Sequence, residues 1–346
     1  MNLYSLFLKN FNKKKKLVFG DEVLTYDDFR REIETFCLSL SLYKNRKIAL
    51  ISKNQKLIGQ LLMVASKLGS TLITINENSS FNQINSQLKL TRPELIICDD
   101  EKKLKNLKYG KKKIQTKEIN KFKKNLNLKN KKKINLNDNY IITFSSGTTS
   151  DPKAVVFSQQ IKYLRFKHIK KLYRLNKKDN IFSVSPLDHS LGQRLFFLAV
   201  LNGISFVFKE KYNFNEIKNI VEKFKITFSI LPSNYLFLLK NKFLKKKIFI
   251  RKIVSGASAL NIKDKIDLIK TGIEFYEMYG ASEIGTVTSF NLNKNKLDSV
   301  GKVLKNMSIK IVNQKGVSLK RGEVGEILCK TPLKFKYYYK NNNLTN

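Results

Sequence analysis

Tryptophan is absent from the sequence, cysteine occurs only three times, and no apolar run is long enough to cross a membrane. Cys37, Cys98 and Cys329 lie far apart, which excludes a cysteine metal site and a redox pair of neighbouring cysteines. The longest apolar run, residues 195–208, falls short of the roughly 20 residues that a membrane span needs. The N-terminal apolar stretch is also too short for a secretory signal. We therefore expect a cytoplasmic globular protein without a membrane span.

Acidic residues are scarce as well: 27 Asp and Glu stand against 67 Lys and Arg, a formal net charge of +40. Such a charge raises the hypothesis of a nucleic-acid-binding protein. However, the lysine runs are scattered along the chain and accompany abundant Asn, Ile, Phe and Tyr, a mixture typical of AT-rich coding sequence. Zinc-finger spacing, aromatic RNA-binding motifs and basic-region heptads are all missing. We expect no nucleic-acid partner and keep this function only as a remote alternative.

Strand-like and helix-like patterns alternate along most of the chain. In residues 24–40, apolar side chains recur at helical spacing, and Thr25 with Asp28 resembles a capping box at the start of this helix. Short apolar strands follow at intervals, each separated from the next by a helix-length segment. This alternation predicts right-handed crossovers and an α/β fold with mostly parallel sheets.

The patterns divide the chain into three expected parts. An N-terminal α/β subdomain spans 1–138, a second α/β subdomain spans 139–285, and a β-rich segment of short strands spans 286–346. Residues 101–137 are rich in Lys, Asn and Leu and predict a solvated excursion that includes an edge strand. His168 lies in a Lys-rich helix, so we expect it on the surface.

The stretch SSGTTSDPK (145–153) joins two apolar runs. Gly147 lets the backbone approach a ligand closely, and successive N–H groups with the Ser and Thr hydroxyls form a site for an anion. Lys153 adds a point charge for phosphate oxygens. The stretch does not match the Walker A pattern. Taken alone, it is either a phosphate loop or an ordinary Ser/Thr turn that ends at Pro152.

The order of residues in this stretch resembles the signature S-G-T-T-G-x-P-K-G of the adenylate-forming superfamily, which includes acyl-CoA synthetases, adenylation domains of peptide synthetases and luciferases. Other segments resemble further motifs of the family in the family's order. They are LTYDDF (24–29), SPLDHSLG (185–192), ITFSILPSNYLFLL (226–239), IVSGASALN (253–261), EMYGASEIG (277–285) and SVGKVL with GEVGEILCK (299–330). The resemblance covers essentially the whole chain, but only the large N-terminal domain of the family.

The resemblance implies an acid–thiol ligase of the acyl-CoA synthetase type, placed in fatty acid metabolism. A carboxylic acid reacts with Mg·ATP to give an acyl-adenylate, and coenzyme A or a carrier-protein phosphopantetheine then takes the acyl group. The implied cofactors are therefore ATP, Mg²⁺ and one of these thiols. The expected partners are a small-molecule carboxylic acid and either an acyl carrier protein or a separately encoded C-terminal domain.

Matching motif positions also imply site residues. Glu283 binds Mg²⁺, Ser282 replaces the family threonine beside the α-phosphate, Tyr279 stacks on adenine, and His189 lies at the acyl pocket. Lys153, Ser282, Glu283 and His189 are the predicted catalytic residues. The residues predicted to bind the nucleotide are Ser145, Ser146, Gly147, Thr148, Thr149, Ser150, Lys153, Gly256, Ala257, Ser258, Tyr279, Gly280 and Ser282.

The chain departs from the family pattern in two ways. Ser150 and Ala154 stand where the family has glycines, which predicts slower turnover without loss of binding. The sequence also stops before the family's T-G-D aspartate and its C-terminal domain, so we expect a truncated or split ligase. Lys336 and Lys340 are expected to be too mobile to replace that domain's lysine. The alternative is a catalytically reduced protein that binds a nucleotide or an acyl group. No acidic or basic residue marks a charged substrate.

Overall fold

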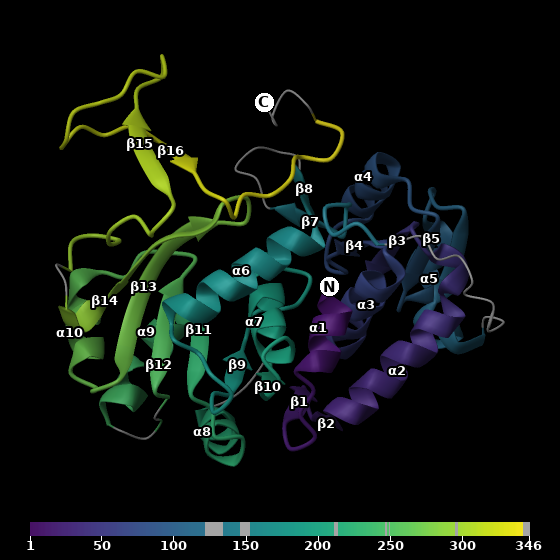
Figure 1. Cartoon of the computed structure of the whole chain (residues 1–346), viewed down its shortest axis with the longest axis horizontal. Coiled ribbons are helices and arrows are strands. Elements are labelled where there is room, and N and C mark those ends of the chain that lie inside the picture. Colours follow the sequence, from purple (N-terminus) through teal and green to yellow (C-terminus); the bar gives the residue numbers. More distant parts are fainter. Residues whose placement is uncertain are drawn as a thin grey trace. The chain divides into compact units, whose positions relative to one another are not determined.

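The computed structural model describes residues 1–121, 134–145, 153–210, 214–245, 248, 250–294 and 297–341 (Figure 1). The chain forms two compact units. The first unit consists of Met1–Lys211 together with Phe335–Asn346, and the second of Tyr212–Lys334. Within the described residues, no helix combines the length and the apolar character that crossing a membrane requires.

The first unit contains a six-stranded sheet in the order β6-β5-β3-β4-β7-β8. All neighbouring strands are parallel except β7 and β8, which form an antiparallel pair. Its strands are β3 (Lys47–Ile51), β4 (Thr71–Ile75), β5 (Leu95–Cys98), β6 (Lys112–Gln115), β7 (Ile141–Ser145) and β8 (Lys153–Phe157). The edge position of β6 confirms the edge strand predicted in the Lys-rich region.

A further group of strands in the first unit pairs in the order β9-β10-β1-β2. Here β9 (Ile181–Ser183), β10 (Phe206–Phe208) and β1 (Lys16–Phe19) are parallel, whereas β2 (Glu22–Thr25) is antiparallel to β1. The helices of this unit are α1 (Leu3–Lys9), α2 (Tyr26–Ser39), η1 (Ser41–Tyr43), α3 (Gln55–Leu68), α4 (Phe81–Thr91), α5 (Glu101–Asn106), η2 (Thr116–Lys121), α6 (Gln159–Leu172) and α7 (Ser190–Val200).

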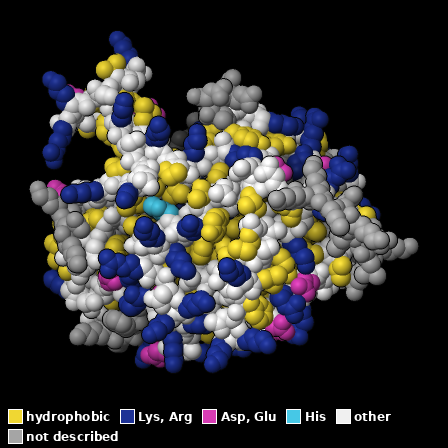
Figure 2. Space-filling model, viewed as in Figure 1, with side chains coloured by type: hydrophobic (Ala, Val, Ile, Leu, Met, Phe, Trp, Pro, Cys, Tyr) yellow, Lys and Arg dark blue, Asp and Glu magenta, His cyan; other side chains and the backbone are white. Residues whose placement is uncertain are grey.

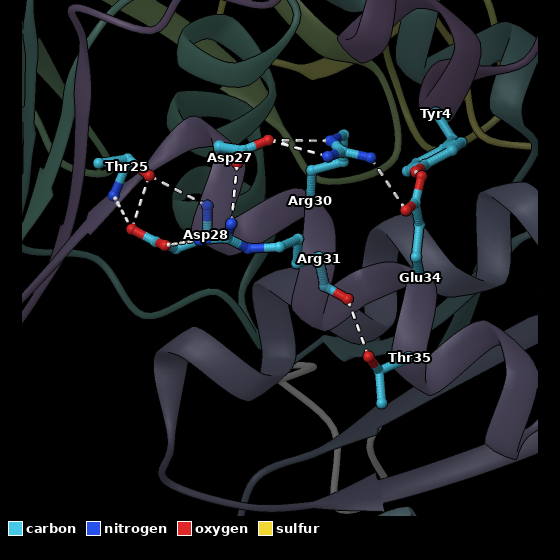
Figure 3. Close-up of polar contacts among 8 residues, drawn as sticks. All are labelled: Tyr4, Thr25, Asp27, Asp28, Arg30, Arg31, Glu34 and Thr35. Carbon is cyan, nitrogen blue, oxygen red and sulfur yellow. Dashed lines mark hydrogen bonds and ion pairs between the residues drawn. The ribbon is translucent and has the colours of Figure 1, made fainter.

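Helix α2 begins at the capping box that the sequence predicts (Figure 3). The Asp28 backbone N–H donates to the Thr25 hydroxyl oxygen at 3.0 Å, and the Thr25 N–H donates to the Asp28 carboxylate at 3.0 Å. Both donors would otherwise lack a partner at the helix start. On the same helix, Arg30 bridges Asp27 and Glu34 at 2.9 and 3.0 Å. The exposed face of α2 is therefore a network of paired charges.

The second unit contains three parallel strands and one antiparallel strand in the order β11-β12-β13-β14. A separate antiparallel pair, β15 and β16, lies in the same unit. The strands are β11 (Phe228–Pro232), β12 (Lys252–Gly256), β13 (Glu274–Ala281), β14 (Gly285–Asn291), β15 (Ser308–Val312) and β16 (Glu326–Lys330). The helices are α8 (Phe214–Lys223), α9 (Ser233–Leu244), α10 (Ile262–Ile269) and η3 (Leu292–Lys294).

The α/β architecture with parallel sheets agrees with the predicted fold class, but the strands are grouped differently from the predicted parts. Strand β7 follows the expected boundary at 138/139, yet it pairs with β4 through Leu72 and Ile141. Strand β14 follows 286 for most of its length and pairs with β13 through Tyr276 and Asn291. Periodicity predicts where an element lies along the chain, whereas strand partners depend on packing between distant segments.

Candidate nucleotide and acyl site

The candidate phosphate loop connects β7 and β8. Strand β7 ends at Ser145, and β8 begins at Lys153, so the strand runs directly into the loop, as predicted. The two flanking residues are paired across the hairpin in the antiparallel register. Their side chains therefore project from adjacent backbone positions at the entrance of the loop. Five predicted phosphate ligands lie outside the described residues: Ser146, Gly147, Thr148, Thr149 and Ser150.

A C-terminal segment covers the open edge of β8. The Tyr339 N–H donates to the Ala154 carbonyl at 2.8 Å, and the Val156 N–H donates to the Tyr337 carbonyl at 3.1 Å. The Lys153 ammonium lies 5.6 Å from the centroid of the Tyr338 ring. Residues far apart in sequence thus support the strand that carries Lys153, and the ring places one apolar wall beside its charge.

The tail lysine at 336 is held in place, so the expectation that it is mobile is wrong. The Lys336 ammonium donates to the Asn137 carbonyl at 2.6 Å and to Asn139 Oδ1 at 3.0 Å. Burial lowers the pKa of this ammonium below its usual value. The neighbouring Tyr337 hydroxyl also bonds to Asn139. These contacts secure the segment against the residues that precede β7.

His189 stands immediately before α7, and 55% of its side chain is exposed. Its Nε2 lies 3.7 Å from Asp188 Oδ2, which accepts a hydrogen bond from Asn76 Nδ2 at 2.9 Å. Gly192 makes this turn possible, because a Cβ there would lie 2.0 Å from the Pro186 carbonyl oxygen. Asn76 follows the carboxyl end of β4, the parallel neighbour of β7. The His189 turn and the phosphate hairpin therefore meet the same edge of the sheet, where ligands bind in parallel α/β folds.

In the second unit, the predicted adenine segment begins where β12 ends, at Gly256. Ala257 has a φ of 72°, a left-handed conformation that costs a residue with a side chain on the order of 1–3 kcal/mol. The Ser258 carbonyl accepts a hydrogen bond from the Ser233 hydroxyl, which also lies 3.2 Å from the Ser255 hydroxyl. Strained backbone of this kind is concentrated at ligand-binding segments.

The segment Tyr279–Glu283 lies at the same sheet edge as the adenine segment. Strands β12 and β13 are parallel, with Ser255 opposite Glu277, so both strands run toward the same edge, although β13 continues to Ala281 in its pairing with β14. The β13–β14 register shifts between Tyr279 and Gly280. A Cβ at Gly280 would lie 1.9 Å from the Gly285 carbonyl oxygen, so only glycine fits there. The structure thus brings Gly256, Ala257 and Ser258 to the edge that carries Tyr279, Gly280, Ser282 and Glu283.

Glu283 is the predicted Mg²⁺ ligand. It is partly buried in the turn that joins β13 to β14. Among the described residues, no cluster of three or more His, Cys, Asp or Glu side chains could hold a metal ion. Mg²⁺ in nucleotide sites is commonly held by one or two carboxylates together with substrate phosphates. A single carboxylate therefore fits such a site when nucleotide phosphates and water supply the other ligands.

Sequence reasoning missed a buried ion pair that supports the adenine side. Lys265 Nζ lies 2.6 Å from Glu277 Oε2, and the Leu260 N–H donates to Glu277 Oε1 at 3.1 Å. The same lysine donates to the Leu297 carbonyl at 2.8 Å. The two-residue alternation of β13 could have predicted the burial of Glu277, because Phe275 and Glu277 lie on the same, inward face of the strand. The pair anchors the chain just beyond Ser258.

Sequence reasoning also missed buried cations between α6 and α7. Lys162 and Arg165 are each 5% exposed, and Lys162 Nζ donates to Gln193 Oε1 at 2.6 Å. His168 was expected on the surface, but its Nε2 is buried, and burial followed by the Arg194 charge lowers the pKa of the imidazole. The sequence feature that predicts this burial is the helical spacing in α6, which places Lys162 and Arg165 on the same face as Phe166.

The parallel sheets, the hairpin entrance and the paired edge of the second unit together define the fold of an adenylate-forming enzyme. The family model described as AMP-binding enzyme matches residues 7–339, so the chain belongs to that family.

Known relatives and structures agree with this assignment. The chain is 26% identical over 330 residues to "4-coumarate–CoA ligase-like 6" of Arabidopsis thaliana, covering 86% of this chain and 58% of that protein. In fold, it is similar to the O-succinylbenzoate coenzyme A synthetase of Bacillus subtilis in complex with AMP, with a TM-score of 0.86, 18% identity and coverage of 99% and 91% of the two chains. A structure of that synthetase with ATP and a magnesium ion gives a TM-score of 0.85, 18% identity and coverage of 99% and 73%.

Proposed function

We propose that the chain activates a carboxylic acid with ATP, forms an acyl-adenylate and pyrophosphate, and delivers the acyl group to a thiol. The observation that carries the proposal is the β7–β8 hairpin, which opens at the paired residues Ser145 and Lys153. Ser145 directly precedes the stretch that resembles the family's phosphate signature, and Lys153 is the lysine of that signature. The relatives' names support coenzyme A as the acceptor, and a carrier-protein phosphopantetheine is the alternative thiol. The chain spans 58% of the length of the Arabidopsis relative, so the complete reaction is part of the proposal.

The residues of the chain would share the work as follows. The Ser145 hydroxyl and the Lys153 ammonium bind β- and γ-phosphate oxygens, and the Ser282 hydroxyl donates to the α-phosphate. Glu283 holds Mg²⁺, which when bound offsets the negative charge of the phosphates. The backbone of Gly256–Ser258 and the ring of Tyr279 bind adenine. His189 positions the carboxylic acid. Catalysis then rests on orientation and on donors that face the charge developing at the α-phosphorus.

Mg·ATP binding tests the nucleotide site directly. Lys153→Ala and Glu283→Gln are each expected to weaken ATP affinity about ten- to a hundredfold in calorimetry, because each removes a charge-assisted contact worth roughly 1.5–3 kcal/mol. Matched controls on exposed positions are Lys178→Ala and Glu222→Gln, which should bind as the wild type does. Equal affinity in the wild type and in both site variants would contradict the assignment.

Pyrophosphate exchange separates a ligase from a protein that only binds its ligands. Because the 346 residues span 58% of a CoA ligase-like relative, we expect slow exchange by this chain assayed alone and stimulation by an added C-terminal domain of a related ligase. Removing one hydrogen-bond donor to the transition state typically lowers the rate about 10²–10³-fold, so stimulation of this size would indicate that the added domain supplies such a donor. ATP binding without exchange under either condition would favour the catalytically reduced alternative.

The charge distribution gives little support to a nucleic-acid interface. On the visible face, Lys and Arg side chains are scattered among uncharged and apolar groups (Figure 2). A protein that follows a phosphate backbone would gather them in a stripe or patch. Strong nucleic-acid affinity with a steep salt dependence would revive that alternative.

A further inference from the structure

The C-terminal segment (residues 336–339) lies beside the β7–β8 hairpin as a third antiparallel chain (Figure 1). The Lys336 N–H donates to the Val156 carbonyl at 2.9 Å, and Tyr338 lies opposite Val155 in an antiparallel bridge. Strand β8 is therefore paired on both sides, with β7 along one edge and the segment along the other. The segment thus reaches the strand that begins at Lys153, although the two lie far apart in sequence.

Side chains alternate between the two faces of these three paired chains. Residues two apart along a strand share a face, so Lys153 lies on the face of Val155 and therefore of Tyr338. Ser145 is paired with Lys153 across the hairpin, and its side chain lies on this face as well. Ala154 lies on the opposite face, in the core. Two proposed phosphate ligands and one tyrosine ring therefore share a face at the entrance of the candidate phosphate loop.

The other two tyrosines of the segment fix its position. Tyr337 and Tyr339 lie on the opposite face, where they pack against the hydrophobic core that contains Ala154. The Tyr337 hydroxyl also donates to Asn139 Oδ1 at 3.0 Å. These contacts hold the backbone on both sides of Tyr338, so the position of its ring is set by the fold.

The Tyr338 ring is an aromatic neighbour of the Lys153 ammonium. Lys153 Nζ lies 5.6 Å from the ring centroid, within the range of a cation–π contact. The Phe335 ring packs on the Tyr338 ring with 4.6 Å between the centroids, which limits the rotation of the tyrosine side chain. A lysine side chain has high rotamer freedom, so a contact that restricts it lowers the entropy lost when the ammonium binds a phosphate.

We propose that Tyr338 is a positioning residue of the nucleotide site. Its ring holds the Lys153 ammonium at the entrance of the candidate phosphate loop, so that nucleotide affinity depends on the pairing of the C-terminal segment with β8. An ammonium has three N–H donors and can therefore face the ring on one side and phosphate oxygens on another. The inference rests on the proposed function, in which Lys153 binds phosphate oxygens, and Tyr338 acts through this lysine.

Calorimetry with Mg·ATP and with Mg·pyrophosphate measures the contribution of the ring. Tyr338→Leu should weaken the affinity for both probes about two- to fivefold, the usual size of an exposed cation–π contact. Tyr338→Phe keeps an aromatic ring and should restore the affinity. Tyr163→Leu is the matched control, because the Lys167 ammonium lies 5.5 Å from the Tyr163 ring on α6, at a position with no proposed role in the site. This control should bind both probes as the wild type does.

A double-mutant cycle separates the positioning of Lys153 from the folding of the segment. In the Lys153→Ala background, Tyr338→Leu should have no further effect on the affinity, since the ring then has no ammonium to position. A loss of the same size with and without Lys153 would show that the substitution acts by displacing the segment, and it would overturn the inference. Circular dichroism of each variant confirms that it is folded.

The remaining outcomes distinguish this inference from the proposed function. Equal affinities of the wild type and Tyr338→Leu would overturn the inference, and tighter binding by Tyr338→Leu would do so by showing that the ring competes with phosphate for the ammonium. In both cases the proposed function stands if Lys153→Ala weakens ATP binding. Pyrophosphate affinity that depends on Tyr338 and Lys153, in a chain that does not bind ATP, would support the positioning role while contradicting the ligase function. Failure of both probes to bind the wild type would contradict both.

Discussion

Lys162 in the first unit and Lys265 in the second are equally buried, with 5% and 4% of their surfaces exposed, yet their surroundings differ. Lys265 faces the Glu277 carboxylate at 2.6 Å. Lys162 donates to a neutral amide and stands beside two arginines, whose charges lower its pKa further. Lys265 thus has a charged partner within the fold, whereas the charges that act on Lys162 are of like sign. Burial alone therefore does not determine the electrostatic surroundings of a lysine.

The largest effect is expected from breaking the paired lysine. Lys265→Met should lower the free energy of unfolding by about 3–5 kcal/mol, because it leaves the Glu277 carboxylate buried without its counter-ion. Urea denaturation at neutral pH measures this loss. Lys263→Met, at an exposed position on the same helix, is the control and should change stability by less than about 0.5 kcal/mol. A loss in Lys265→Met no larger than that of the control would end the distinction between the two lysines.

Replacing Lys162 should change the free energy of unfolding by less, and this change should depend on pH. Between the lowered pKa of folded Lys162 and its usual value of 10.5, the unfolded chain binds more protons than the folded chain. Wild-type stability should therefore gain from this group as pH rises through that window, and Lys162→Met should lack that gain. Urea denaturation from pH 7 to 10, with Lys171→Met as control, measures the difference. Parallel pH profiles of the wild type and Lys162→Met would show that the burial of this charge costs nothing.

The smallest effect concerns the exposed charges of α2 (Figure 3). Thr25→Ala should cost about 1 kcal/mol, the usual loss of an N-cap side chain. The Thr25 hydroxyl hydrogen bond is the main cause that lowers the pKa of Asp28 to about 2, so its contribution is present above the usual carboxyl pKa and is lost as pH falls toward 2.

The stability gap between the wild type and Thr25→Ala should therefore narrow from pH 4 to pH 2. Thr35→Ala, whose hydroxyl donates to the Arg31 carbonyl within the helix, is the control. A stability gap that stays constant with pH would show that the contribution of the Thr25 cap does not depend on the ionisation of Asp28.

Local sequence patterns were sufficient for features that depend on neighbouring residues. Thr25 and Asp28 marked the start of α2 because a cap needs only residues three positions apart. The apolar run before Ser145 marked a strand that ends at the candidate loop. The order of motifs from 24 to 330 indicated the family, which the AMP-binding enzyme model shows for residues 7–339. The roles of Lys153, His189 and Glu283 remain proposals that the binding experiments test.

Only the tertiary structure decided which distant residues share an environment. Glu277 and Lys265 look like two ordinary charges in sequence, and packing of α10 on β13 turns them into a buried pair. Lys162 and Arg194 stand on different helices, and the packing of α6 on α7 places both charges around one cavity. The sequence by itself determined elements, caps and family membership, because these depend on short-range periodicity and motif order. The surroundings of these buried cations depended on which helix faces meet, and that is set by burial of apolar area across the whole unit.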